Sequence, residues 1–178
     1  MGLNPTIFFA LLALLLVIER LAELIPAKRN FSRLIAIGGR EFGAPHYPAI
    51  VAMHVAFFVS LIVEFNFRDA PLAQYWQIPF GIFLLAQALR FWVRNTMGDR
   101  WTTRVVVVPG ERLIASGPFR FISHPNYVAV ACEFFSLPLI FDLYYTCAVF
   151  SILNAIILLL FRIPSERAAL DWSQNPES

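Results

Sequence analysis

Apolar residues in this chain gather into five long runs, which polar and turn-forming segments separate. The runs cover about residues 6–25, 49–65, 76–93, 127–141 and 143–161. A helix needs roughly 20 residues, and at least about 17, to cross the hydrocarbon core of a bilayer. Four of the runs reach this length, and the 127–141 run falls short of it. The pattern predicts an all-α integral membrane protein with about five transmembrane helices.

The connections between the runs predict a hairpin, a lid and a short terminal helix. Only Asp142 separates the fourth and fifth runs, which indicates a tight helical hairpin, and Pro138 predicts a kink in the fourth helix. In the long 94–119 connection, the sequence RVVVVPGERLI (104–114) is typical of two short strands around a Pro-Gly turn. We therefore expect a hairpin lid on the cytosolic side. Pro164 fits the first turn of a new helix, which predicts a short interfacial helix at the C-terminus.

Composition supports the membrane assignment and excludes other classes. Of the 178 residues, 58% are hydrophobic and 15% are charged, whereas about one quarter of a soluble domain is charged. A net charge of +2 gives no reason to expect a nucleic-acid partner. No segment outside the apolar runs is long enough to bury a core of its own. We therefore expect one membrane domain over residues 1–178.

Basic residues lie almost entirely on one side of the predicted helices. Arg68 stands alone on the other side. The basic side carries Lys28, Arg29, Arg33, Arg40, Arg94, Arg100, Arg104, Arg112, Arg120, Arg162 and Arg167. Loops rich in lysine and arginine stay in the cytosol. We expect the N-terminus to face outward and the C-terminus to lie in the cytosol.

Ionisable residues inside the apolar runs need an explanation, because a charge in the bilayer is costly. Glu19 and Glu23 lie one turn apart on one face of the first helix. They form either an interhelical ion network with a nearby arginine or the wall of a site. His54 lies inside the second helix, and Arg90 near the end of the third is either a snorkelling arginine or part of a site. The three histidines are scattered without a cysteine or carboxylate frame, so we expect no metal site.

A second polar group falls where the predicted helices reach the cytosol. The stretch GPFRFISHPNYVAV (117–130) places His124 and Tyr127 one turn apart at the start of the fourth run. Arg162 ends the fifth run, and Glu166 opens the terminal helix. These two are either a membrane anchor and a first-turn helix acid or parts of a site. Arginine suits an anionic group and glutamate suits a diol, an ammonium or proton removal, which indicates a nucleotide-like cofactor.

Two motifs at this edge resemble those of one known family. GPFRFISHPNY (117–127) is similar to the Gly-Pro…His-Pro-x-Tyr signature of the isoprenylcysteine carboxyl methyltransferase family, and RIPSE (162–166) resembles its Arg-Ile-x-x-Glu-Glu motif. The resemblance implies a membrane enzyme that uses S-adenosylmethionine (SAM) at the cytosolic edge and admits a lipophilic acceptor from the bilayer. It implies a cofactor-binding catalytic half over residues 94–172. The N-terminal spans, residues 1–93, then form the acceptor side.

The resemblance also assigns roles to particular residues. The residues expected to bind SAM are Gly117, Pro118, His124, Tyr127, Arg162 and Glu166. The residues expected to act in catalysis are Arg162, Glu166 and Arg90. The residues expected on the acceptor side are Glu19, Glu23, His46 and His54. A base for the acceptor is open between His46 and Glu166, and Ser123 and Arg167 depart from the family motifs.

The N-terminal half resembles a bacterial branch of this family that is associated with type III polyketide synthases. The motifs that carry this resemblance are ERLAE (19–23), GGRE (38–41), HYP (46–48) and His54. It implies a bacterial inner-membrane enzyme that O-methylates a phenolic or pyrone polyketide, with a functional link to such a synthase. A prenylcysteine-like carboxylate stays open as the acceptor. Two alternatives remain: an NADPH-dependent membrane reductase of the sterol-reductase type, which carries a similar His-Pro-Asn-Tyr stretch, and a non-enzymatic membrane scaffold.

Overall fold

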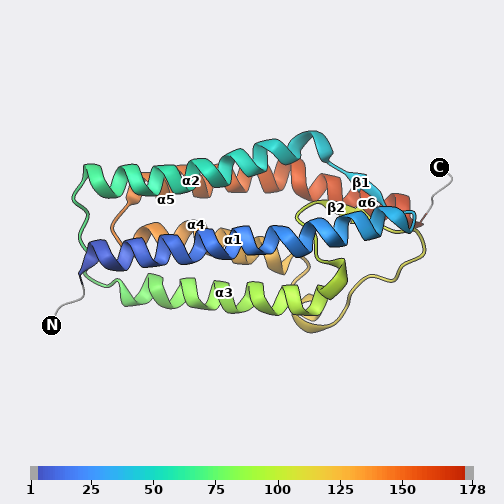
Figure 1. Cartoon of the computed structure of the whole chain (residues 1–178), viewed down its shortest axis with the longest axis horizontal. Helices are drawn as coiled ribbons and strands as arrows, with labels where there is room; N and C mark the ends of the chain where they lie inside the picture. The colour runs from blue at the N-terminus through green and yellow to red at the C-terminus, as the bar shows by residue number, and fades with distance from the viewer. Residues whose placement is uncertain (1–3, 175–178) are drawn as a thin grey trace.

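The computed structural model describes residues 4–174, which form a bundle of helices along one long axis (Figure 1). The α-helices are α1 (Pro5–Ala36), α2 (Tyr47–Phe67), α3 (Gln77–Met97), α4 (Pro125–Leu139), α5 (Tyr144–Ile157) and α6 (Ile163–Gln174). A π-helical turn, Leu158–Arg162, joins α5 to α6, and 3₁₀ turns cover Ala44–His46, Gly98–Arg100 and Gly117–Arg120. Two short strands, β1 (Arg40–Phe42) and β2 (Val105–Val107), complete the fold. The prediction of a mostly helical protein is confirmed.

The surface of the bundle is apolar, as a bilayer would require. On α1, Phe9, Leu12 and Leu16 recur at helical spacing and are buried in the core. Leu11 and Leu15 on the same helix are 60% and 62% exposed. Two helical segments of the described chain are long and apolar enough to cross a membrane, Ala44–Phe67 and Tyr144–Gln174.

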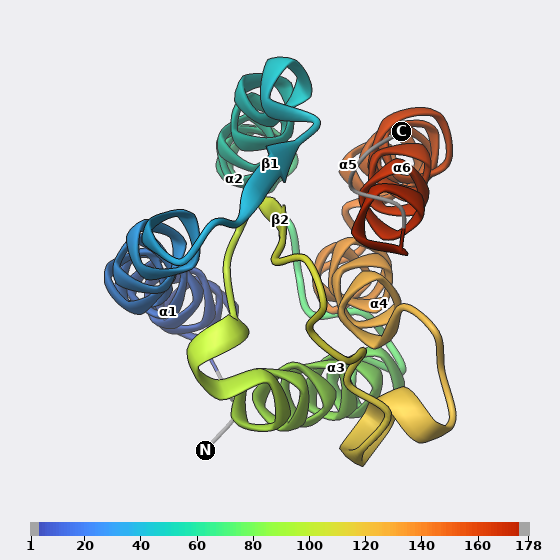
Figure 2. The same ribbon diagram turned by 90° about the vertical axis from the view of Figure 1, so that its right-hand side faces the viewer.

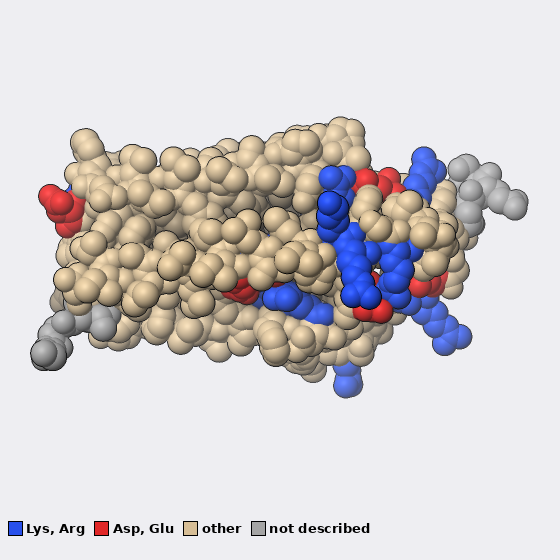
Figure 3. All heavy atoms as spheres, viewed as in Figure 1, with Lys and Arg blue, Asp and Glu red and all other residues tan. Residues whose placement is uncertain are grey.

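Charged residues are concentrated at one end of the bundle. Figure 3 shows lysine and arginine side chains gathered at the end that carries β1, β2 and α6. Figure 2 views the molecule from this end, and there β1 and β2 cross the space between α1, α2 and α4. This polar end is the side that the sequence predicts to be cytosolic.

The predicted hairpin lid within residues 104–114 is wrong. The Pro-Gly turn is present, but β2 pairs antiparallel with β1, which puts Val106 opposite Glu41. The guanidinium of Arg104 lies 2.6 Å from the Glu41 carboxylate and 4.2 Å from the centre of the Tyr47 ring. Glu111, in the expected second strand, pairs instead with Arg100 at 3.1 Å. The ion pair and the ring contact stabilise the pairing of β2 with the distant strand β1. The two strands therefore join the loop before α2 to the loop after α3.

The first helix is longer than predicted. Its apolar run ends near Ile25, but α1 continues through Pro26 to Ala36. In the extension, Ala27, Asn30 and Leu34 are buried. The Asn30 amide donates to the carbonyl oxygens of Gly98 and Trp101, at 3.2 and 2.9 Å. The extension is therefore held by contacts beyond the apolar run.

The tight hairpin between the fourth and fifth runs is confirmed. Asp142 adopts a positive φ of 52° between α4 and α5, and the Tyr144 hydroxyl donates to its carboxylate at 2.6 Å. Pro138, expected to kink the helix, lies in the last turn, so it marks the end of α4. Glu64 of α2 accepts hydrogen bonds from the backbone N–H groups of Tyr145 (3.2 Å) and Thr146 (2.7 Å). The first N–H groups of a helix have no partner within it, and here a buried carboxylate accepts hydrogen bonds from two of them.

The terminal helix follows α5 without a break, although Pro164 predicts the start of a separate helix. Pro164 lies at the second position of α6, but the path from Tyr144 to Gln174 is continuous, and the π-helical turn takes the place of a break. Proline lacks the N–H that an α-helical turn would need at this point. The short terminal helix itself is present as α6.

Candidate functional site

A cavity of about 510 Å³ lies between α1, α2, α4 and α5, toward the polar end of the bundle. This volume is within the roughly 300–1,000 Å³ of small-molecule pockets. Its polar wall contains Arg20, Glu23, Arg90, Asn126, Tyr127 and Arg162. Its apolar wall contains Leu21, Leu24, Val51, Val55, Val59, Ile62 and Leu158. The cavity therefore suits a ligand, or a pair of ligands, with one polar and one apolar part.

The apolar wall is open at the side of the bundle. Leu24 of α1 and Val51 and Val55 of α2 line the cavity, and all three are exposed on the outer surface as well. The gap between α1 and α2 therefore gives access to the cavity from the apolar surroundings of the bundle.

Four residues that the sequence assigns to a cofactor site meet beside the polar end of the cavity, but two of them, His124 and Glu166, do not line it. The Tyr127 hydroxyl donates to Glu166 and accepts from the Arg162 Nε at 3.0 Å. His124 Nδ1 lies 3.0 Å from the second Glu166 oxygen, and its ring stacks on Tyr127 with centroids 5.3 Å apart. Another Arg162 nitrogen donates to the Thr103 carbonyl at 3.2 Å. The start of α4, the π-helical turn and α6 thus supply one hydrogen-bonded cluster.

Local sequence explains why these side chains meet. Pro125 opens α4, so His124 precedes the helix and Tyr127 lies in its first turn. Arg162 and Glu166 are four residues apart on one continuous helical path and face the same side. Tyr127 and Arg162 also line the cavity.

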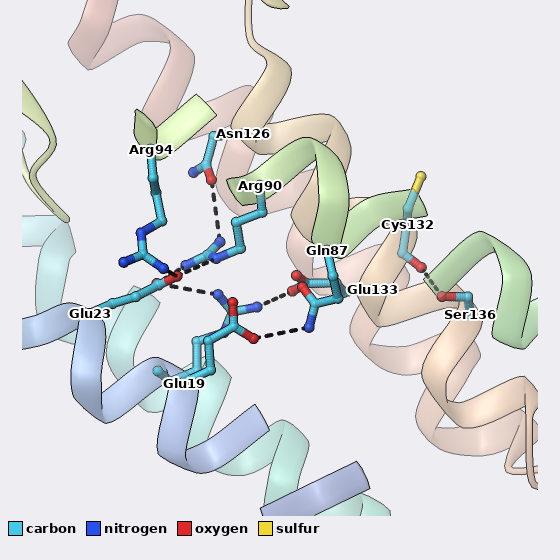
Figure 4. Close-up of polar contacts among 10 residues, drawn as sticks. Glu19, Glu23, Gln87, Arg90, Arg94, Asn126, Cys132, Glu133 and Ser136 are labelled. Atoms are coloured by element: carbon cyan, nitrogen blue, oxygen red, sulfur yellow. Dashed lines mark hydrogen bonds and ion pairs between the residues drawn. The ribbon is translucent and has the colours of Figure 1, made fainter. Parts of the chain in front are cut away.

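A buried ion network forms the neighbouring wall (Figure 4). Glu23 is 2% exposed and accepts hydrogen bonds from Arg20, Arg90 and Arg94, with Arg90 Nε at 3.0 Å and Arg94 at 3.0 Å. The third Arg90 nitrogen donates to the Asn126 side chain at 3.2 Å. Arg90 thus joins α1 to the first turn of α4.

The network extends along α1 to a second set of contacts. Arg20 also pairs with Glu133 of α4, and Glu19 accepts from the Gln87 amide at 3.1 Å. One oxygen of Glu133 and one of Gln87 are buried without a hydrogen-bond partner among the described residues. Three carboxylates and three guanidiniums meet here, so the charges balance.

The network decides two questions that the sequence left open. Glu23 belongs to an interhelical ion network that includes Arg20, as one of the two interpretations of the first helix states, and this network also forms part of the cavity wall. Arg90 does not snorkel, because it is 6% exposed and all three of its nitrogens are bonded inside the bundle.

Other predicted site residues lie elsewhere. Gly117 has a positive φ of 56° and packs against Thr96 of α3, and the fully buried Pro118 follows it; neither lines the cavity. His46 contacts Phe161, with ring centroids 4.7 Å apart and the rings tilted by 39°, and it lines a small separate pocket. His54 does line the cavity.

Three residues that sequence reasoning missed belong to this region. Glu133 carried a signal, since it is an isolated carboxylate inside the apolar 127–141 run. Asn154 is buried and lines the cavity, and it too is a polar residue inside an apolar run. Trp101 lines the cavity, and its indole N–H has no partner among the described residues. Within residues 4–174, no group of three His, Cys, Asp or Glu side chains is placed to hold a metal ion.

The fold and the site describe a helical protein with two apolar spans and a polar site at one end of a cavity that opens sideways. Residues 79–171, more than half of the chain, match the model of the isoprenylcysteine carboxyl methyltransferase (ICMT) family. The chain belongs to this family.

Two relatives extend the similarity over most of the chain. The protein YpbQ of Bacillus subtilis, described as uncharacterized, is 38% identical over 162 residues, which cover 91% of this chain and 96% of the relative. An uncharacterized protein of Haemophilus influenzae is 28% identical over 143 residues, which cover 80% and 83% of the two chains. No solved structure matches the chain. Family membership and the two apolar helices indicate a membrane enzyme of the methyltransferase class.

Proposed function

We propose that the protein is a SAM-dependent methyltransferase that O-methylates a lipophilic acceptor at the cytosolic edge of the membrane. One observation carries this proposal: Tyr127 and Arg162, which both contact Glu166, line one end of a cavity whose other wall is apolar and laterally open. A water-soluble cofactor and a membrane-soluble acceptor can therefore meet in it.

The polar end fits the chemical groups of SAM. The Arg162 guanidinium suits its carboxylate, and Glu166 suits its ammonium or ribose hydroxyls. Trp101 adds an indole N–H that lacks a partner inside the protein and is available to an acceptor atom of the cofactor. SAM, when bound, supplies a methyl group on a positively charged sulfur.

The protein's main tasks in such a transfer are alignment and exclusion of water. Tyr127 and Arg162 hold each other at the polar end, and Arg90 fixes Asn126 next to Tyr127. Gly117 and Pro118 act on the site indirectly, because they pack the preceding loop against α3. The β1–β2 pair crosses the same end (Figure 2) and shields it from the cytosol.

The apolar part of the cavity belongs to the acceptor, which enters between α1 and α2. His54 lies in this part, while Glu19 and Glu23 hold the adjoining network. His46 closes the cytosolic side of α2 against Phe161. The acceptor class is a phenolic or pyrone polyketide or a prenylcysteine-like carboxylate, and a type III polyketide synthase is the expected functional partner for the first of these.

We further propose that α1, α3 and α4 cross the bacterial inner membrane together with the two apolar spans, with the N-terminus outside. The exposed leucines of α1 and the basic end in Figure 3 support this arrangement.

Cofactor binding tests the proposal directly. The purified protein in detergent is expected to bind S-adenosylhomocysteine, the demethylated product of SAM, and Glu166→Ala is expected to weaken this binding at least about tenfold, or about 1.4 kcal/mol. Glu111→Ala is the matched control, because Glu111 pairs with Arg100 in a loop outside the cavity. Unchanged affinity in Glu166→Ala removes this residue from the cofactor site. A protein that binds NADPH but not SAM or S-adenosylhomocysteine is identified as a reductase. A protein that binds none of these cofactors supports the scaffold alternative.

A further inference from the structure

The apolar part of the cavity contains two polar side chains that present hydrogen-bonding atoms without a partner among the described residues. His54 of α2 and Asn154 of α5 both line the cavity. Asn154 is 3% exposed, yet its side chain makes no hydrogen bond to any described residue. An amide that lines a cavity and bonds nothing within the protein can bond a polar group placed in that cavity, so Asn154 points to a ligand group there.

The contacts of the two helices place these residues opposite each other. α2 and α5 run antiparallel: the Ser60 and Thr146 hydroxyls are 2.8 Å apart, and the Phe57 and Phe150 rings are 5.5 Å apart. His54 lies three residues before Phe57, and Asn154 lies four residues after Phe150. Residues three or four apart share a helix face. The pair therefore occupies the next turn of the same interface, one step closer to the polar end.

The hydrogen bond of His54 defines what its ring can offer. Nδ1 lies 2.8 Å from the Ile50 carbonyl oxygen, which only accepts, so Nδ1 carries a hydrogen. In the neutral ring Nε2 then presents a lone pair, and no described residue donates to it. The ring packs against Phe134, with centroids 5.1 Å apart. His54 thus presents a hydrogen-bond acceptor inside an apolar wall.

The pair lies apart from the cofactor cluster. Phe134, the neighbour of His54, is seven residues beyond Tyr127 on α4, which corresponds to roughly 10 Å along the helix. The pair therefore lies beside the apolar wall, where the lipophilic acceptor is expected. The Arg20–Glu133 ion pair adjoins it, because Glu133 directly precedes Phe134.

We propose that His54 and Asn154 form the recognition pair for a hydroxyl group on the lipophilic acceptor. The hydroxyl donates to His54 Nε2, and the Asn154 amide donates to an oxygen of the same head group. A carboxylate would present only lone pairs to Nε2, so the pair favours a hydroxylated acceptor over a prenylcysteine-like carboxylate. This inference rests on the proposed function, because it assigns the apolar part of the cavity to the methyl acceptor.

Binding of a matched pair of lipids tests the proposal. The probes are pentadecylresorcinol and its dimethyl ether, which has the same chain but no hydroxyl donor. We expect the wild-type protein to bind the free phenol at least about tenfold more tightly, the equivalent of about one hydrogen bond. His54→Leu and Asn154→Leu are each expected to lose most of this preference. Asn66→Leu, a control that removes an exposed polar residue of α2, is expected to keep it.

Two further variants protect the test against a folding defect. Affinity for S-adenosylhomocysteine is measured in every variant and is expected to stay within about twofold of the wild type, because the pair is outside the polar cluster. If the His54→Leu variant fails to fold, the His54→Phe variant is used in its place. His54→Gln, whose amide oxygen can accept the hydroxyl, is expected to restore part of the preference.

The outcomes separate this inference from the proposed function. A wild-type protein without preference for the free phenol, or a His54→Leu variant that keeps the preference, overturns the recognition pair. A protein that prefers the free phenol but binds no S-adenosylhomocysteine supports the pair and refutes the methyltransferase function.

Discussion

The buried network around Glu23 gives the largest expected effect of a single substitution. Glu23→Gln keeps the shape of the side chain but removes the charge that three arginines share. Arg94 is 29% exposed and can turn toward water. Arg90 cannot, since it is buried and fixed between Glu23 and Asn126. The variant therefore leaves Arg90 inside the bundle without the carboxylate that it pairs with directly.

The magnitude follows from the cost of such a charge. Breaking a buried ion pair by removing one partner costs about 3–5 kcal/mol. For a chain of this size, about 1 kcal/mol shifts the unfolding midpoint by roughly 2–4 °C, so we expect a fall of roughly 6–20 °C. Thermal unfolding in detergent, followed by circular dichroism, measures it.

A double variant and a control complete the experiment. Glu23→Gln combined with Arg90→Met removes both partners, and we expect it to be more stable than Glu23→Gln alone by about 0.5–3 kcal/mol. Asp99→Asn breaks the exposed pair with Arg33 and is expected to change the unfolding free energy by less than about 1 kcal/mol. The reasoning is refuted if Glu23→Gln costs less than about 1 kcal/mol, or if Arg90→Met adds its own full cost to that of Glu23→Gln.

Two further predictions concern the ends of the bundle. Glu64→Leu leaves the N–H groups of Tyr145 and Thr146 without their acceptor, so we expect a loss of about 1–3 kcal/mol in thermal unfolding; a variant as stable as the wild type contradicts the capping role. Gly43→Ala strains a position with a φ of +68° and places a Cβ 2.6 Å from the Ser165 hydroxyl, so we expect faster proteolytic cleavage of the loop before α2. Equal cleavage rates in variant and wild type would show that the loop does not depend on this close approach.

The helices and the Arg162–Glu166 contact were largely predictable from the sequence, because both depend on local spacing. Apolar runs locate α2 to α5, and the four-residue spacing of Arg162 and Glu166 puts them on one side of a helix. The meeting of these residues with His124 and Tyr127 came from the family resemblance, which the match over residues 79–171 supports.

What the sequence did not predict depends on pairing between distant segments. The β2 strand has an apparent partner six residues away, but its real partner, β1, lies more than sixty residues earlier. The contacts of Arg104 with Glu41 and Tyr47 favour the distant strand. The extension of α1 was not predicted for a related reason. An apolar run indicates which part of a helix lies in the bilayer, and the helix itself can continue beyond it. Asn30 stabilises that extension through carbonyl groups about seventy residues away.

The π-helical turn Leu158–Arg162 sets the rotational phase of everything that follows it. Asn154 and Arg162 are eight residues apart, and in a regular α-helix that spacing separates two side chains by roughly 80° around the axis. A π-helical turn holds one extra residue and takes back about 100°, so the two side chains come nearly into line and both reach the cavity. If the same residues formed a regular α-helix, α6 and Glu166 would instead be rotated by about a quarter of a turn relative to α5. The π-helical turn therefore decides which way Glu166 faces, more than the identity of its exposed leucines does.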